Sequence, residues 1–138
     1  MSGRQSAEDR KVQIVAEVLR IADEIGPDRL STTDVARAIG ISQPAIFRHF
    51  PTKSALWLAV AEDIGVRLQR DWTAAEAAAD GPRARLKALI NAQLVAIAET
   101  PALPSILFSR ELQVENHALR DVFRGLLAAF QGRLVAAI

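Results

Sequence analysis

Apolar residues recur at helical spacing along almost the whole chain, and no stretch alternates apolar and polar positions for long. This pattern predicts an all-α fold, in which we count seven helices. The first helix is expected to begin after the cap Ser6 and to end at Gly26-Pro27. One of its faces is apolar and carries Val15, Val18, Leu19, Ala22 and Ile25.

Two short helices are predicted in succession within residues 31–53, which read STTDVARAIGISQPAIFRHFPTK. Ser31 or Thr32 can cap the first, which ends at Gly40, and Ser42 can cap the second, which ends before Pro51. Helices of about two turns bury their apolar residues only by packing crosswise on each other and on the first helix, which is a helix-turn-helix. The expected core residues of this unit are Val35, Ala36, Ile39, Ile41, Ile46 and Phe50.

The rest of the chain predicts four further helices. Thr52 can cap a helix that continues through Leu68, and the chain then breaks at Gly81-Pro82. The next helix ends at Thr100-Pro101, another covers about 104–114, and Asn116 can cap a last one with a wide apolar face. The fifth helix carries an apolar stripe of Leu86, Leu89, Ile90, Leu94 and Ile97. We expect two domains, a helix-turn-helix unit at 1–53 and a helical bundle at 54–138.

The composition argues against several classes of function. The chain has no Cys and only two His, so neither disulfides nor a metal site is expected. It has no apolar run of about 18 residues and no signal peptide, which favours a cytoplasmic protein without a membrane partner. It also lacks a nucleophile motif and a phosphate-cradling glycine loop, so we predict neither enzymatic activity nor a cofactor.

Charge is distributed unevenly, although the net charge is only +1. No Asp or Glu occurs between Val35 and Ala61, whereas Arg37, Arg48, His49 and Lys53 all lie in that interval. The outer face of the second short helix lies in the same interval. It carries residues that the core does not need, namely Gln43, Pro44, Ala45, Phe47, Arg48 and His49.

This outer face suits duplex DNA. A helix fits the major groove, where Gln43 can pair with adenine, Arg48 with guanine, and Pro44 or Ala45 can abut a thymine methyl group. Phosphates could be held by the hydroxyl and ammonium groups of Thr32 or Thr33, Ser42 and Lys53. The alternative from the residues alone is a helical corner with a solvated polar face, as occurs in many enzymes.

Several motifs at fixed offsets resemble the signature of TetR-family transcriptional regulators. They are Thr32-Thr33, Val35-Ala36, Gly40-Ile41-Ser42, Phe47-Arg48-His49-Phe50 and Lys53-Ser54-Ala55-Leu56, and the resemblance covers about 7–58. It implies base contacts by Gln43, Pro44, Ala45 and Arg48, and phosphate contacts by Thr32, Thr33, Ser42, Phe47, His49 and Lys53. The family commonly has Tyr in place of Phe47, whose ring has no hydroxyl and packs either against the DNA backbone or into the core.

The resemblance also implies an all-helical regulatory domain that binds a small-molecule effector and forms a homodimer through its last two helices. Candidate effector contacts are Trp72, Gln93, Phe108 and Arg110, with Ser109 and His117 as further candidates; each also fits a core or surface role. The chain ends in RLVAAI within a helical pattern. We therefore expect a C-terminally truncated chain whose dimer helices are incomplete.

Three functions of different classes follow from these observations. The favoured one is a ligand-responsive DNA-binding regulator, a repressor that binds a near-palindromic operator. The alternative is a protein-interaction module that keeps the regulator fold but does not read DNA sequence. The third is a small helical enzyme, for which His49 beside Arg48 is the only polar cluster to test.

Overall fold

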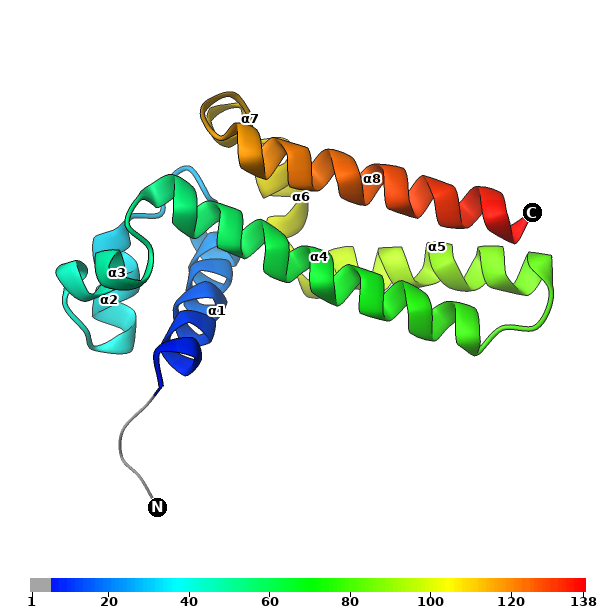
Figure 1. The fold of residues 1–138 in the computed structure, drawn as a ribbon, viewed down its shortest axis with the longest axis horizontal. Helices are drawn as coiled ribbons and strands as arrows, with labels where there is room; N and C mark the ends of the chain where they lie inside the picture. Colours follow the sequence, from blue (N-terminus) through cyan, green and yellow to red (C-terminus); the bar gives the residue numbers. More distant parts are fainter. Residues whose placement is uncertain (1–5) are drawn as a thin grey trace, which may run out of the picture.

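The computed structural model describes residues 6–138, and within them it contains eight helices and no strand. The all-α prediction is therefore confirmed, whereas the count of seven helices is wrong by one. The helices are shown in Figure 1 and comprise α1 (Ala7–Ile25), α2 (Thr32–Ile39), α3 (Gln43–His49), α4 (Lys53–Ala77), α5 (Pro82–Glu99), α6 (Ala102–Leu107), α7 (Arg110–Glu115) and α8 (His117–Ala137).

The additional helix arises because the segment expected to be one helix over about 104–114 divides into α6 and α7 at Ser109. The backbone of Ser109 is extended there, and its hydroxyl accepts a hydrogen bond from the Leu112 amide, which caps α7. The same hydroxyl donates to Asp28 Oδ1 at 2.8 Å. A contact to a residue 81 positions away thus fixes a break that local periodicity does not reveal.

The helix-turn-helix is built by local signals that the sequence displays. Ser31 caps α2 through a reciprocal capping box with Asp34, and Gly40 adopts a left-handed conformation (φ 73°, ψ 31°) that ends α2. Ser42 then caps α3 by accepting from the Ala45 amide. In the expected core, Val35, Ala36, Ile46 and Phe50 are buried, whereas Ile39 and Ile41 are partly buried against it.

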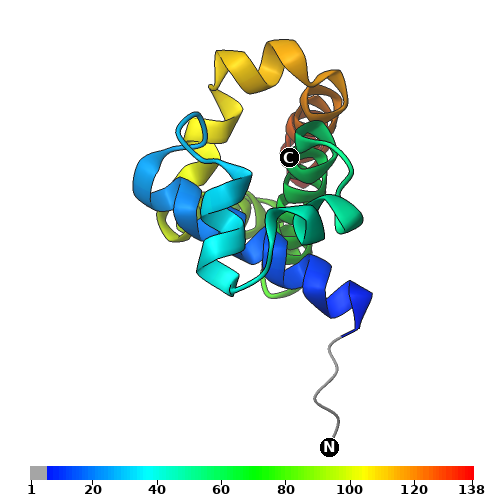
Figure 2. The same ribbon diagram turned by 90° about the vertical axis from the view of Figure 1, so that its left-hand side faces the viewer.

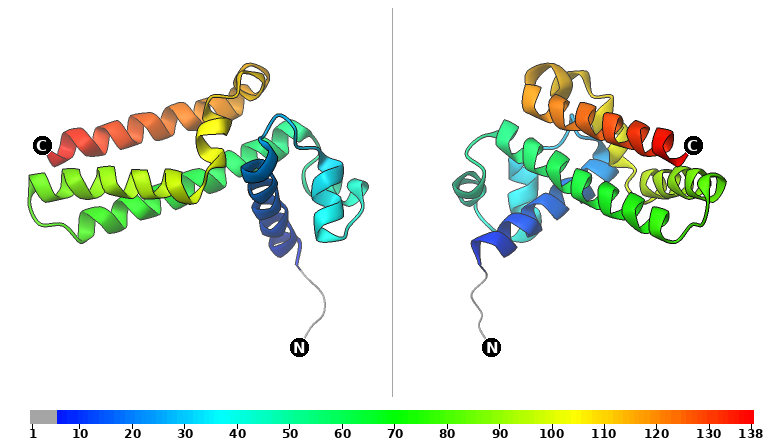
Figure 3. Two further views of the ribbon diagram at one scale, coloured as in Figure 1. Left: turned by 180° about the vertical axis from the view of Figure 1, so that it is seen from behind. Right: turned by 45° about the vertical axis from the view of Figure 1, so that its right-hand side comes forward.

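Helix α4 is common to both halves of the molecule. It also packs on α1, and its later turns pack on both α5 and α8, so the three long helices run side by side (Figures 1 and 3). The buried α4 residues include Leu56, Val60 and Ile64 toward its start and Leu68 and Trp72 toward its end. The boundary predicted at residue 53 falls where α4 begins, so no separate linker joins the two predicted domains.

Helix α5 buries fewer residues than its apolar stripe predicts. Leu89 is fully buried and Leu86 is partly buried, but Ile90, Leu94 and Ile97 are exposed. Ala96 is the other buried residue of α5, which packs on α4 and α8. The apolar stripe of α5 is therefore only partly buried in the described structure.

Three hydrogen bonds join the helix-turn-helix unit and the start of α4 to the segment from α6 to α8. Asp23 Oδ1 of α1 accepts from the Ala102 amide at the start of α6 (2.6 Å). Ser109 donates to Asp28, as described above. Asn116 Nδ2 donates to the Ser54 carbonyl in the first turn of α4 (2.9 Å), while Asn116 Oδ1 caps α8. We call these three bonds the junction.

Asn116→Ala tests the junction. The change removes the cap of α8 and the side-chain donor to the Ser54 carbonyl, which keeps its bond within α4, so we expect the free energy of unfolding to fall by about 1 to 3 kcal/mol. Urea denaturation followed by circular dichroism measures this loss. Asn91→Ala, at an exposed position of α5, is the matched control and should change stability by at most about 0.5 kcal/mol. Equal losses in the two variants would contradict the structural role of Asn116.

Candidate functional site

Helix α3 lies at one end of the molecule, away from α5 and α8, and Figure 2 views this end directly. Its side chains Gln43, Pro44, Phe47 and Arg48 are exposed and line a shallow hollow, which we call the α3 surface. Ala45 and His49 are half-buried beside it. The residues predicted to touch bases are therefore brought together on one accessible face, and their contacts with DNA stay a prediction.

Gln43 is held in place by a neighbour from α2. Its Nε2 donates a hydrogen bond to Thr32 Oγ1 at 2.7 Å, and Thr32 itself is only 8% exposed. The Oε1 atom of Gln43 remains available as an acceptor, and the Thr32 hydroxyl proton remains available to a phosphate oxygen. A bidentate pair between Gln43 and adenine requires Nε2 as well, so Gln43 would exchange Thr32 for the base.

Candidate phosphate-binding groups border the α3 surface. Ser42 and Thr33 are exposed at the starts of α3 and α2, and Lys53 is exposed at the start of α4. Lys53 also lines a narrow cleft of about 70 Å³ together with Glu111 and Glu115. No carboxylate of residues 6–138 lies within 4.0 Å of its Nζ, although Asp28 also lines this cleft, so an anion bound by Lys53 would compete with nearby acidic side chains.

The electrostatics of this end favour an anionic partner. In the part of the chain that the structure describes, neither Arg37 nor Arg48 forms an ion pair. The two arginines of the acid-free interval are therefore not paired with carboxylates among the described residues. Unpaired Arg and Lys side chains are the groups that bind phosphates and base edges.

Phe47 belongs to the surface rather than to the core. Its side chain is 37% exposed and is not buried in the core, and its contact with the DNA backbone stays a prediction. An exposed phenyl ring can pack on a sugar-phosphate backbone but offers it no hydrogen bond.

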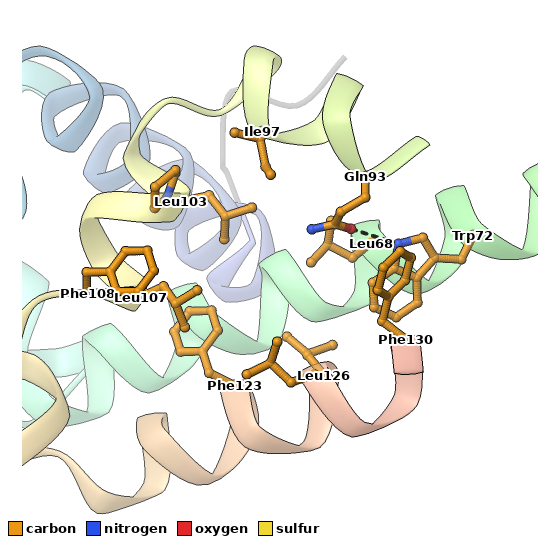
Figure 4. Close-up of a pocket in the computed structure, with 12 residues that line it drawn as sticks. Leu68, Trp72, Gln93, Ile97, Leu103, Leu107, Phe108, Phe123, Leu126 and Phe130 are labelled. Carbon is orange, nitrogen blue, oxygen red and sulfur yellow. Dashed lines mark hydrogen bonds between the residues drawn. The ribbon is translucent and has the colours of Figure 1, made fainter. Parts of the chain in front are cut away.

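An interior cavity of about 270 Å³ lies between α4, α5, α6 and α8 (Figure 4). Eleven of its twelve lining residues are aliphatic, aromatic or proline, and the other is Gln93. The lining residues are Leu68, Trp72, Gln93, Ile97, Leu103, Pro104, Leu107, Phe108, Phe123, Leu126, Leu127 and Phe130. Phe108 and Leu127 are 79% and 60% exposed, so the cavity is open to solvent on their side.

A single polar contact organises one end of this cavity. Trp72 Nε1 donates to Gln93 Oε1 at 2.9 Å, and Trp72 is only 1% exposed. The Trp72 ring also contacts Phe130, with ring centroids 5.0 Å apart, and Arg133 lies over it at 5.6 Å. Arg133 forms an ion pair with Glu76 outside the lining.

The predicted effector contacts are distributed unevenly with respect to the cavity. Trp72, Gln93 and Phe108 line it, although their contact with an effector stays a prediction. Arg110 does not line it and is exposed at the start of α7. Ser109 is engaged in the junction, and His117 is exposed beside Arg120.

Sequence reasoning did not identify Asp23 and Asp28, because their partners lie about 80 residues further along the chain.

The structure adds two negative findings for residues 6–138. None of the helices there combines the length and apolar character needed to cross a membrane. The same residues contain no group of three or more His, Cys, Asp or Glu side chains suited to hold a metal ion.

The fold and the α3 surface define a helix-turn-helix protein with a helical second half. Residues 14–60 match the profile of the bacterial regulatory proteins of the tetR family. This match identifies a TetR-family helix-turn-helix domain in that part of the chain, and the solved relatives described next support the same assignment.

Three relatives illustrate the similarity. The nucleoid occlusion factor SlmA of Haemophilus ducreyi is 26% identical over 118 residues, which are 85% of this chain and 58% of that protein. The TetR-family transcriptional regulator PfmR of Thermus thermophilus has a TM-score of 0.60 at 25% identity, over 89% of this chain and 70% of that one. The crystal structure of superantigen pfit has a TM-score of 0.67 at 26% identity, over 96% and 69%. The chain therefore spans between 58% and 70% of the length of these relatives.

Phe47→Tyr tests the placement of this residue on a DNA-facing surface. The added hydroxyl can donate to a phosphate, and a hydrogen bond to a charged group contributes about 1.5 to 3 kcal/mol. We expect the variant to bind all duplexes more tightly, roughly tenfold or more, as measured by fluorescence anisotropy. Phe108→Tyr adds the same hydroxyl at an exposed site far from α3 and should leave DNA affinity unchanged. A gain from both variants, or from neither, would contradict the placement.

Proposed function

We propose that the chain is a sequence-specific DNA-binding transcriptional regulator, a ligand-responsive repressor that binds a near-palindromic operator as a homodimer. The observation that carries this proposal is the α3 surface. It combines side chains that can pair with base edges on an exposed helix, arginines that form no ion pair among residues 6–138, and the starts of α2 and α4 beside it.

The proposed division of labour separates reading from positioning. In the major groove, Arg48 would pair with guanine and Gln43 with adenine, while Pro44 and Ala45 would contact thymine methyl groups. Thr32, Thr33, Ser42, His49 and Lys53 would bind phosphates, and Phe47 would pack on the backbone. Two copies of the chain would place their α3 helices in successive major grooves, about 34 to 36 Å apart.

The proposed ligand response acts through α6. This helix contributes Leu103 and Leu107 to the cavity, and its first amide donates a hydrogen bond to Asp23 of α1. Helix α1 in turn packs directly on α2 and α3. A ligand that displaces α6 would therefore act on the helix-turn-helix through the junction as well as through α4. A ligand shifts the equilibrium only by the difference in its affinity for the two states, so the response requires that α6 differ between them.

A second candidate is nucleoid occlusion, because the similarity to SlmA extends over 85% of the chain. A local regulator would occupy few sites near promoters, whereas a nucleoid occlusion factor would occupy sites spread around the chromosome. Genome-wide mapping of the bound sites distinguishes these two functions. The protein-interaction module remains the alternative if no DNA sequence is preferred.

Selection from a random pool of duplexes tests the proposal. The selected sequence and a scrambled control are then titrated at several salt concentrations. We expect tight, strongly salt-dependent binding with a large specificity ratio. A near-palindromic sequence would support a dimer, and a single half-site would contradict pairing in this chain. Enrichment of no sequence would overturn the proposal in favour of the interaction module.

Arg48→Ala and Lys53→Ala test the division of labour. Because Arg48 is assigned to a base, its loss should cost about 1 to 3 kcal/mol on the selected sequence and relax specificity at one position. Lys53 is assigned to a phosphate, so its loss should weaken binding to all sequences alike and lower the salt slope by about 1. Arg83→Ala, at an exposed position of α5 at the far end of the molecule, is the control. Equal effects of both variants on selected and random DNA would refute the assignment.

A further inference from the structure

We infer that the interior cavity binds an uncharged, predominantly apolar ligand that carries a hydrogen-bond acceptor, and that Gln93 Nε2 donates to this acceptor. The inference rests on the proposed function in so far as it specifies the effector of the proposed regulator. The binding step itself is independent of DNA and is tested separately.

The lining of the cavity excludes charged ligands. None of its twelve residues is ionisable, and their only polar side-chain groups are the indole N–H of Trp72 and the amide of Gln93. A carboxylate or an ammonium group placed there would lose its hydration without gaining a partner of opposite charge, which is costly. Arg133 and Glu76 neutralise each other in an ion pair, and neither residue lines the cavity.

The orientation of the Gln93 amide follows from the chemistry of its partner. An indole nitrogen can only donate, so the atom that faces Trp72 Nε1 must be the carbonyl oxygen of Gln93. The amide nitrogen is therefore directed away from Trp72. Figure 4 shows it pointing into the part of the cavity between Leu68, Leu103 and Leu126.

This amide nitrogen is a donor without an intramolecular acceptor. Among residues 6–138, the hydrogen bond of the Gln93 side chain is the one that it accepts from Trp72. Gln93 is partly exposed, so water can satisfy its two N–H bonds until a ligand with a matching acceptor takes that place beside the apolar walls. A carbonyl, ether or hydroxyl oxygen on the ligand would supply that acceptor.

The remaining walls determine the rest of the ligand. Trp72, Phe123 and Phe130 present aromatic rings, and leucines from α4, α6 and α8 fill the space between them. Aromatic edges and faces favour a ring or an alkyl chain. The volume of about 270 Å³ lies near the lower end of the range for ligand pockets, so a single ring with a short chain is the expected size.

A matched set of three probes tests this inference on the purified chain. Benzylacetone has a phenyl ring, a short chain and a ketone oxygen; butylbenzene has the same shape without the oxygen; hydrocinnamate carries a carboxylate instead. We expect benzylacetone to bind roughly three- to tenfold more tightly than butylbenzene, and hydrocinnamate to bind at least tenfold more weakly than benzylacetone at neutral pH. Calorimetry or NMR titration measures the three affinities.

Gln93→Met assigns the preference to one residue. Methionine keeps the length of the side chain but has no donor, so benzylacetone and butylbenzene should bind this variant equally. Gln69→Met, at an exposed position of α4 that does not line the cavity, should keep the wild-type preference. The ratio between two probes on the same protein is insensitive to a partial loss of folded protein. In the wild-type chain, benzylacetone should also shift the side-chain amide NMR signal of Gln93 more than butylbenzene does.

The inference is overturned if hydrocinnamate binds as tightly as benzylacetone, if the ketone gives no advantage over the hydrocarbon, or if neither uncharged probe binds saturably. Failure of the proposed function gives a different result. In that case the three probes bind as expected, but benzylacetone does not change the affinity for the selected duplex, or no duplex is selected at all.

Discussion

Helix α4 contributes buried side chains along its whole length to one hydrophobic core that extends through both halves of the molecule, and the positions of the two halves depend on this shared helix. Its 25 residues span about 37 Å, with Leu56 and Val60 buried toward its start and Leu68 and Trp72 buried toward its end, and the helix packs on α1, α5 and α8. At Gly65 the absence of a side chain lets α8 approach closely, since a Cβ there would lie 3.3 Å from Leu126. A change in the packing around Trp72 therefore reaches the helix-turn-helix along a continuous helix.

The junction gives the same two halves a second connection. Asp23 binds the first amide of α6, and Asn116 binds the first turn of α4, so the segment that borders the cavity is tied to both ends of the helix-turn-helix unit. The α3 surface and the interior cavity are far apart, yet each is built on helices that these bonds and α4 hold together. This arrangement is what a binding protein with a responsive second site requires.

Much of the helix-turn-helix could be predicted from the sequence because its signals are local. Gly40, Ser42 and Pro51 each determine the backbone within a few residues, and the structure places the helix ends there. The break at Ser109 could not be predicted, because it depends on Asp28. The α5 stripe was misleading for a related reason, since periodicity shows which residues share a face but not which neighbours cover it. The hydrogen bond from Gln43 to Thr32 likewise could not be predicted, because it depends on how α2 and α3 cross.

The central claim is that duplex DNA binds the α3 surface and the starts of α2 and α4. Amide NMR shifts measured while the purified chain is titrated with its selected duplex test this claim most directly. The account predicts that the large shifts fall within residues 31–53, with smaller ones along the start of α4. Large shifts on α5 and α8 with an unchanged α3 would contradict it and would place the partner on the other half of the molecule.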